Sequence, residues 1–144
     1  MVTYGSGIVD GRAAFGVNWI NVGYFFYGDD KLNSFQLVVI DRSDRTNGDF
    51  DLEFNYSQIQ WEAGDVSGGS DGLYILDYID AGDCPARAGY ASANGSTFEM
   101  NGSAVPRALL DTNLTTGLIY QDFNSTVPGR YVFQFTNGIP NGTP

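Results

Sequence analysis

The chain contains no histidine and a single cysteine, so the side chains most used in enzyme and metal chemistry are nearly missing. Without histidine, the usual general base and the commonest transition-metal ligand are excluded. One cysteine cannot build a zinc site, and the motifs of serine hydrolases, P-loop enzymes and dinucleotide-binding enzymes do not occur. The sequence therefore argues against most catalytic classes.

Positive charge is also scarce. Only 7 Lys and Arg residues stand against 17 Asp and Glu residues, which gives a formal net charge of -10. A chain without a basic stripe cannot neutralise phosphates, so nucleic acid is excluded as a partner. No apolar run reaches the length of about 18 residues that a membrane span needs. The N-terminal stretch also lacks the basic start and apolar core of a signal peptide, so we expect a soluble chain whose signal, if it is secreted, is not part of this sequence.

Helical periodicity is the last feature that the sequence lacks, because no window repeats its apolar residues every 3.6 residues over three turns. Instead it has 19 Gly, 9 Tyr and 10 Phe residues, with alternating stretches between Gly- and Asn-rich turns. A chain of 144 residues fits one core. We predict an all-β fold: a single-domain antiparallel β-sandwich with long loops and at most one or two short helices.

The stretch FNYSQIQWEAGD (54–65) breaks its own pattern. Apolar and polar residues alternate over residues 50–56, but the next large apolar residues, Ile59 and Trp61, fall out of phase. An extra residue near Ser57 and Gln58, forming a β-bulge, would return both to the core side. We therefore expect a bent strand with its aromatic side chains buried.

The remaining elements follow from turn residues and apolar runs. We expect strands over residues 15–26 and 33–40, and a last strand that places Tyr131, Phe133 and Phe135 on one face. Expected turns are Asn-Gly pairs at 47–48, 94–95 and 101–102, and a type II turn at 128–129. Residues 104–113 have the only plausible helical turn.

The carboxylates permit two kinds of site. Glu53, Glu62 and Asp65 are the best candidates for the acid pair of a hydrolase, but a residue such as Glu53, on the polar side of a strand, is better interpreted as solvated surface. Calcium suits acidic loops better, although EF-hand spacing is absent. The weak calcium candidates are Asp65 with Asp71, and Asp77, Asp80 and Asp83. No other cofactor is expected.

The distribution of asparagine residues indicates N-linked glycosylation. Six Asn residues open an N-x-[ST] sequence, where roughly one or two would arise by chance. The alternative is that Asn, Gly, Ser and Thr are turn residues that co-occur in any loop-rich β protein. The predicted glycosylation sites are Asn55, Asn94, Asn101, Asn113 and Asn124; Asn141 is a weak acceptor because Pro144 stiffens the chain nearby.

Several segments together carry a resemblance: NVGYF, NSFQLVVI, FNYSQIQWEAGDVSGG, ARAGY and VPGRYVFQF, in this order. They resemble the nidogen-like extracellular (NIDO) domain family over residues 15–138, and the aromatic, Asn-Tyr, Ile-x-Trp and Gly-rich series is the most specific piece. The resemblance implies one NIDO-like domain over 1–144, with short terminal extensions. It also implies an extracellular module of matrix, adhesion or surface proteins, with no catalytic residues to transfer.

One insertion departs from the family. YILDYIDAGDC stands where a short glycine-rich link is usual, and it contains the only cysteine, Cys84. Cys84 is either a free thiol or bonded to a cysteine outside this chain. The insertion either covers an edge of its own sheet or contacts another copy through Tyr74, Ile75, Tyr78 and Cys84, as a filament or a dimer.

We therefore predict a secreted, non-enzymatic matrix or adhesion module that binds copies of itself or other extracellular proteins. The alternatives are a carbohydrate- or calcium-binding module and, far behind, a carboxylate-based hydrolase.

Overall fold

The computed structural model describes residues 1–75, 85–92 and 95–141, and every regular element in these ranges is a strand. Six strands form the main sheet, in the order β1-β2-β3-β4-β9-β10, with every neighbouring pair antiparallel. They are β1 (Val2–Val9), β2 (Arg12–Tyr24), β3 (Gly28–Asp41), β4 (Phe50–Ile59), β9 (Arg130–Thr136) and β10 (Ile139–Pro140). Two hairpins stand apart: β5 (Gly69–Ser70) with β6 (Leu73–Tyr74), and β7 (Gly89–Ala91) with β8 (Thr97–Glu99).

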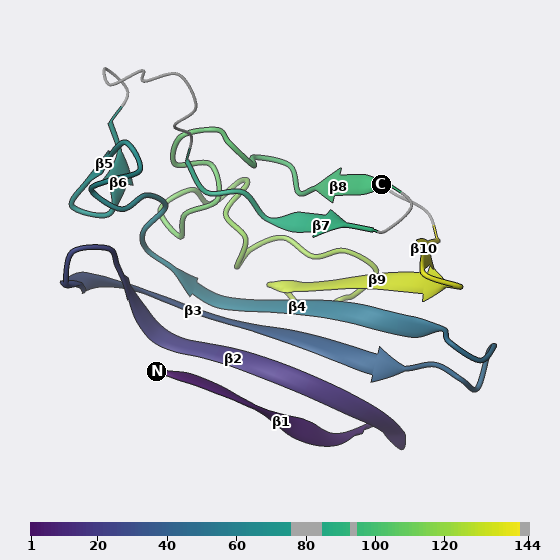
Figure 1. Cartoon of the computed structure of the whole chain (residues 1–144). Coiled ribbons are helices and arrows are strands. Elements are labelled where there is room, and N and C mark those ends of the chain that lie inside the picture. The colour runs from purple at the N-terminus through teal and green to yellow at the C-terminus, as the bar shows by residue number, and fades with distance from the viewer. Residues whose placement is uncertain (76–84, 93–94, 142–144) are drawn as a thin grey trace.

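The strands and loops form two layers (Figure 1). The main sheet is one layer; the other, called the loop layer below, is the described part of residues 85–129 and includes β7 and β8. The predicted all-β, antiparallel fold is confirmed, with long loops in place of a second large sheet. Residues 104–113 are turns, so the expected helical turn is wrong. Ala104 and Arg107 both have positive φ and Pro106 lies between them, which is incompatible with a helix.

The predicted bulge is present. Ser34 pairs with Gln58 and Phe35 with Tyr56, so Ser57 is the extra residue in β4. This insertion shifts the side-chain phase by one and sends Ile59, 6% exposed, into the core. The expected burial of the aromatic side chains is wrong, since Phe50, Phe54, Tyr56 and Trp61 are only half-buried. The type II turn is also present, since Gly129 has a φ of 81° and Arg130 N–H donates to Val127 O at 3.1 Å.

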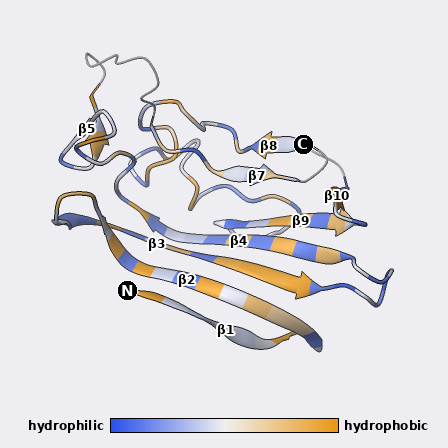
Figure 2. Ribbon diagram, viewed as in Figure 1, coloured by the Kyte–Doolittle hydropathy of each residue, from blue (hydrophilic) through white to orange (hydrophobic). Residues whose placement is uncertain are grey.

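One face of the main sheet is apolar. Residues paired across strands share a face, and aromatic residues recur from pair to pair, as in Phe35–Tyr56 and Phe54–Tyr131. Figure 2 shows the alternation along the strands and the continuous hydrophobic end of β3, which matches the apolar run expected over 33–40. The buried core cluster lies between this face and the loop layer: Ile59, Met100, Leu109, Leu110, Leu118, Tyr131, Phe133 and Phe135.

The other face carries a network of hydrogen-bonded polar side chains beside the buried Val38 and Ile40. Glu53 is 7% exposed, which corrects the expectation that it belongs to a solvated surface. Arg130 Nη2 donates to one of its carboxylate oxygens at 2.6 Å, and Asn55 Nδ2 donates to the other at 2.8 Å. Asn55 Nδ2 also reaches Gln36, whose own amide nitrogen donates to Asn18, so side-chain bonds cross four strands.

Candidate interaction surface

The apolar face of the sheet is covered over β4 and β9 and open over β1, β2 and β3. Phe133, beneath the loop layer, is 2% exposed, whereas Phe15 on β2 is 44% exposed. The open half presents exposed and half-exposed apolar side chains at alternating positions: Tyr4, Phe15, Val17, Trp19, Phe35, Leu37 and Val39. Contiguous exposed apolar surface of this kind is typical of interaction sites.

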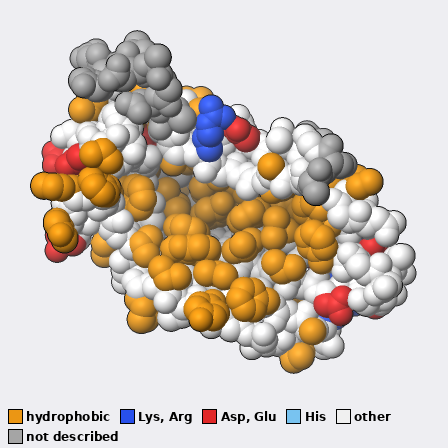
Figure 3. All heavy atoms as spheres, viewed as in Figure 1, with side chains coloured by type: hydrophobic (Ala, Val, Ile, Leu, Met, Phe, Trp, Pro, Cys, Tyr) orange, Lys and Arg blue, Asp and Glu red, His pale blue; other side chains and the backbone are white. Residues whose placement is uncertain are grey.

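A groove of about 260 Å³ lies where the open half meets the loop layer. Figure 3 shows hydrophobic side chains gathered in this hollow between the two layers. The sheet contributes one wall and the loop layer the other, the lining residues being Trp19, Phe35, Leu37, Phe54, Tyr56, Ile59, Glu62, Ala86, Arg87, Ala88, Gly89, Leu109 and Leu118. The groove is therefore apolar along its length, with one cation and one carboxylate in its lining.

Two stacked aromatic rings form part of the groove. The Trp19 and Phe35 rings lie 4.9 Å apart with an interplanar angle of 15°, and Tyr56 continues the row 6.2 Å from Phe35. Burial raises the pKa of Tyr56, so its hydroxyl stays neutral at physiological pH. Neutral, rigid aromatic rings offer a large contact area at low cost in conformational entropy.

The carboxylates proposed as a hydrolase pair differ in their surroundings. Glu62 lines the groove, and its two oxygens accept backbone N–H bonds from Tyr74 at 3.2 Å and Arg107 at 2.7 Å. Glu53 faces the polar side of the sheet, where it pairs with Arg130, and Asp65 is exposed in the turn that follows Glu62. Glu62 thus holds two loops in place with both of its oxygens engaged, and Glu53 is bonded to Arg130 and Asn55 on the other face of the sheet.

The comparison with protein families decides the class. The sequence model described as Nidogen-like domain matches residues 3–137. The chain belongs to the Nidogen-like domain family. This confirms the resemblance inferred from the aromatic and Ile-x-Trp segments. Among the described residues, no helix has the length and apolar character needed to cross a membrane.

A curated relative of this Nidogen-like domain is Nidogen of Drosophila melanogaster, which is 27% identical over 127 residues. The match covers 87% of this chain but 8% of the fly protein, so the chain spans a small part of that relative's length. No solved structure matches.

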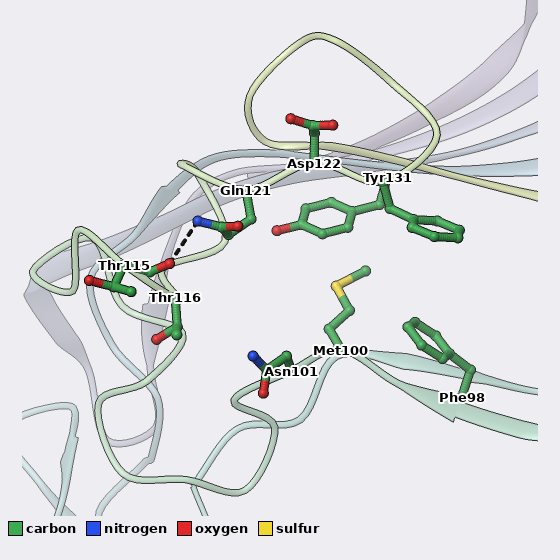
Figure 4. A pocket seen from close by; sticks show the side chains of 9 residues that line it. Phe98, Met100, Asn101, Thr115, Thr116, Gln121, Asp122 and Tyr131 are labelled. Atoms are coloured by element: carbon green, nitrogen blue, oxygen red, sulfur yellow. Dashed lines mark hydrogen bonds between the residues drawn. The ribbon is translucent and has the colours of Figure 1, made fainter. Parts of the chain in front are cut away.

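A second, smaller pocket of about 180 Å³ lies between the end of β8 and residues 115–123 (Figure 4). Phe98, Met100 and Tyr131 line its apolar side, and Gln121 Nε2 donates to Thr115 O across its polar side at 2.7 Å. Burial raises the pKa of Tyr131 to about 12, and its hydroxyl donates to Leu118 O at 3.1 Å. The side chains of Gln121 and Tyr131 in this pocket therefore bond within the Nidogen-like domain itself.

The calcium candidates that the structure describes do not belong to a metal-binding cluster. Asp65 and Asp71 are both exposed, and no group of three or more His, Cys, Asp or Glu residues suited to a metal occurs in the described ranges. The hydrogen bond from Tyr24 to Asp30, at 2.6 Å, raises the pKa of Tyr24 to about 12, with smaller contributions from the charges of Asp71 and Asp65. Asp77, Asp80 and Asp83 lie outside the described residues.

The glycosylation candidates differ in their surroundings. Asn101 is exposed in a turn beside the second pocket, and Asn124 is exposed with its amide bonded to Val132 O at 3.1 Å. Asn113 is half-buried and its side-chain oxygen accepts two backbone N–H bonds from the turn that follows. Asn55 has its amide nitrogen engaged on the polar face, and Asn94 lies outside the described residues.

The predicted assembly segment is described only at its start. Tyr74 is 9% exposed within the β5–β6 hairpin, while Ile75 is 38% exposed. Tyr78 and Cys84 lie outside the described residues. Of the named assembly residues that the structure describes, only Ile75 offers substantial surface to another molecule.

Sequence reasoning missed the open groove and the strand β1. The signal for the groove is present: Phe15, Val17 and Trp19 alternate on β2, and pairing that run with residues 35–39 would have joined the rings on one face. The strand β1 carries few large residues and two glycines, so its period-2 pattern is faint.

Proposed function

We propose that this Nidogen-like domain is a non-enzymatic extracellular module, of matrix or adhesion type, that binds another extracellular protein through its open apolar groove. The observation that carries the proposal is the stacked Trp19–Phe35 pair, which lines a groove on the uncovered half of the sheet. Aromatic residues are enriched at the centres of protein interfaces, where a few anchors supply most of the binding energy.

The chemistry of the site favours binding over catalysis. The groove lining contains one carboxylate, Glu62, and both of its oxygens already accept backbone N–H bonds. The neighbouring Arg87 pairs with Glu99 at 2.6 Å. The charged groups of this site bond within the domain, and the rest of its surface is apolar. Such a site is expected to bind a hydrophobic protein segment.

An extracellular setting is supported by family membership, by the curated relative named Nidogen and by the density of N-x-[ST] sequences. We propose glycosylation at the exposed Asn101 and Asn124 in material from a eukaryotic source. Calcium and carbohydrate stay as alternative ligands of this extracellular module, and the experiment below separates them.

Saturable binding of the purified domain to cell-free extracellular matrix from its source tests the proposal. Trp19→Ala with Phe35→Ala should weaken binding at least about tenfold, since the loss of a buried aromatic anchor commonly exceeds 1.4 kcal/mol. Leu114→Ala is the matched control, because Leu114 is 73% exposed and is not among the groove-lining residues. Circular dichroism of each variant verifies that the fold is kept.

Equal binding by the groove variant and the control would refute the role of the groove. Loss of binding in EDTA would favour the calcium alternative, and saturable binding to an oligosaccharide array with no binding to matrix protein would favour carbohydrate. Turnover of a glycoside that Glu62→Gln abolishes would revive the hydrolase.

A further inference from the structure

The strand β1 forms the outer edge of the main sheet and carries none of the usual protection. It pairs with β2 on one side and with no described strand on the other. Edge strands of natural proteins are normally blunted by charged residues, proline or a bulge, because their unpaired backbone groups invite another strand. The sequence VTYGSGIV contains no charge and no proline, and its register with β2 is uninterrupted over eight residue pairs.

The hydrogen-bond phase of β1 identifies which backbone groups face outward. Met1 N donates to Ile20 O at 2.6 Å and Ile20 N–H donates to Met1 O at 2.8 Å, so these two residues form a hydrogen-bonded pair. Such pairs alternate along an antiparallel ladder. Thr3, Gly5 and Gly7 therefore bond inward to β2.

The residues between them direct N–H and C=O to the free edge: Val2, Tyr4, Ser6 and Ile8.

The same four residues place their side chains on the apolar face. Val2 lies opposite Trp19 and Tyr4 opposite Val17, and the Tyr4 ring lies 6.2 Å from that of Phe15. Tyr4 and Ile8 are 76% and 71% exposed. The edge thus combines unpaired backbone groups with exposed apolar side chains, and both repeat at the same positions.

We propose that β1 pairs antiparallel with β1 of a second copy of this chain, and that the two main sheets join edge to edge. Full overlap requires that outward-facing residues meet outward-facing residues, which places Val2 opposite Ile8 and Tyr4 opposite Ser6 of the second copy. A two-fold axis then passes beside Gly5, which faces Gly5 of the second copy. This contact is the same on both chains, so it closes as a dimer.

A second copy fits this edge for two reasons. The alternation in β1 is self-complementary, because reversing the strand about Gly5 superimposes apolar-face positions on apolar-face positions. The chain as a whole carries a net charge of -10, which opposes contact between most of its surfaces. The edge Val2–Val9 has no charged side chain, so the paired strands would place no like charges opposite each other.

Pairing would also extend the open apolar half, since the apolar faces of the two copies would be continuous across the axis. The proposal is independent of the groove. A failure of edge pairing leaves the role of Trp19 and Phe35 untouched, and the dimer can form without any matrix ligand.

Disulfide trapping tests the register. Gly5→Cys and Gly7→Cys are made separately with Cys84→Ser, so each variant has one thiol; a Cβ at either glycine meets no atom within 4 Å. The pair at Gly5 is a non-hydrogen-bonded one with Cα atoms about 4.5 Å apart, which a disulfide spans. The two Gly7 residues lie four residues apart in register, about 13 Å, which a disulfide cannot span.

Gly5→Cys should cross-link at least about tenfold faster than Gly7→Cys, because pairing raises the effective concentration of its thiols. Equal rates, or faster cross-linking of Gly7→Cys, would overturn the proposed pairing.

Sedimentation equilibrium of the unmodified chain gives a second, independent measurement. Its average mass should rise with concentration toward that of a dimer. Ser6→Pro removes one N–H that points to the free edge, a change that edge strands accommodate, and should keep the folded chain monomeric. Ser6→Ala retains that N–H and should dimerise like the unmodified chain. A monomeric unmodified chain up to millimolar concentration, or a folded Ser6→Pro dimer, would overturn the proposal.

Discussion

The covered and open halves of the apolar sheet face have the same alternating sequence pattern but differ in how far their side chains are buried. On β9, Tyr131 and Phe133 alternate with Val132 and are 6% and 2% exposed. On β2, Phe15 alternates in the same way and is 44% exposed. Alternation thus determines which face of a strand is apolar, and the loop layer determines whether that face is buried.

The loop layer is held over β4 and β9 by side chains that bond to distant backbone groups. Asp111 Oδ1 accepts the Ile59 N–H at 2.8 Å, and Ile59 O in turn accepts the Asp111 N–H at 2.9 Å. Glu62 binds the Arg107 N–H from the other direction. These bonds end near the boundary between the two halves, where the groove begins.

The largest expected effect is a difference between the two halves in how much a substitution lowers the free energy of unfolding. Phe133→Ala should lower the free energy of unfolding by about 3–5 kcal/mol, because it removes a buried ring that packs against Phe54, Tyr90 and Phe123. Trp19→Ala on the open half should cost about 1 kcal/mol, near the centre of the range for point mutations. Urea denaturation followed by circular dichroism measures both, and equal losses would contradict the division into halves.

An intermediate effect is expected at the boundary. Glu62→Ala leaves the backbone N–H groups of Tyr74 and Arg107 without their acceptor and should cost about 1–3 kcal/mol. Glu62→Gln keeps one acceptor oxygen and should lose less. Hydrogen exchange provides the local measurement: the Arg107 amide should exchange faster in Glu62→Ala, while amides at the far end of β9 stay protected. Unchanged exchange at Arg107 would show that the bond does not hold the loop.

The smallest expected effect depends on pH. Burial raises the pKa of Asp111 above its unfolded value, despite the opposing Ile59 N–H bond, so the folded state loses stability as pH rises through this interval. Asp111→Asn keeps the acceptor oxygen and removes the charge. The variant should be more stable at pH 7 by a few tenths of a kcal/mol, since solvent screens a partly exposed carboxylate, and the difference should vanish below the unfolded pKa.

Thermal unfolding of the two proteins at pH 3 and pH 7 measures this difference. A stability difference that is the same at both pH values would mean that the charge of Asp111 is not its cause.

The sequence predicted local features well and long-range burial poorly. The bulge at Ser57 and the turn at Gly129 depend on a few neighbouring residues, so phase and turn chemistry were enough. Burial of Asp51 and Glu53 depends on arginines supplied by the adjoining turn and by β9, with Arg130 lying 77 positions from Glu53. The alternation of apolar and polar residues in the sequence does not predict such ion pairs.

The groove likewise depends on where the loop layer stops. That boundary is set by single side-chain bonds, such as Glu62 to Arg107, which join residues 45 positions apart. The groove therefore could not be predicted from the sequence alone, although the sequence shows its aromatic residues.

The hydrogen bonds of Asn55 on the polar face bear on the order of glycosylation and strand pairing. Its amide nitrogen donates to both Gln36 and Glu53, and attachment of a sugar replaces one of that nitrogen's hydrogens. A sugar at Asn55 and a complete set of cross-strand bonds are thus mutually exclusive. We therefore expect that a transferase could modify Asn55 only before β3 and β4 pair, so the fraction of chains with a sugar at this site would report how fast the two strands pair relative to glycosylation.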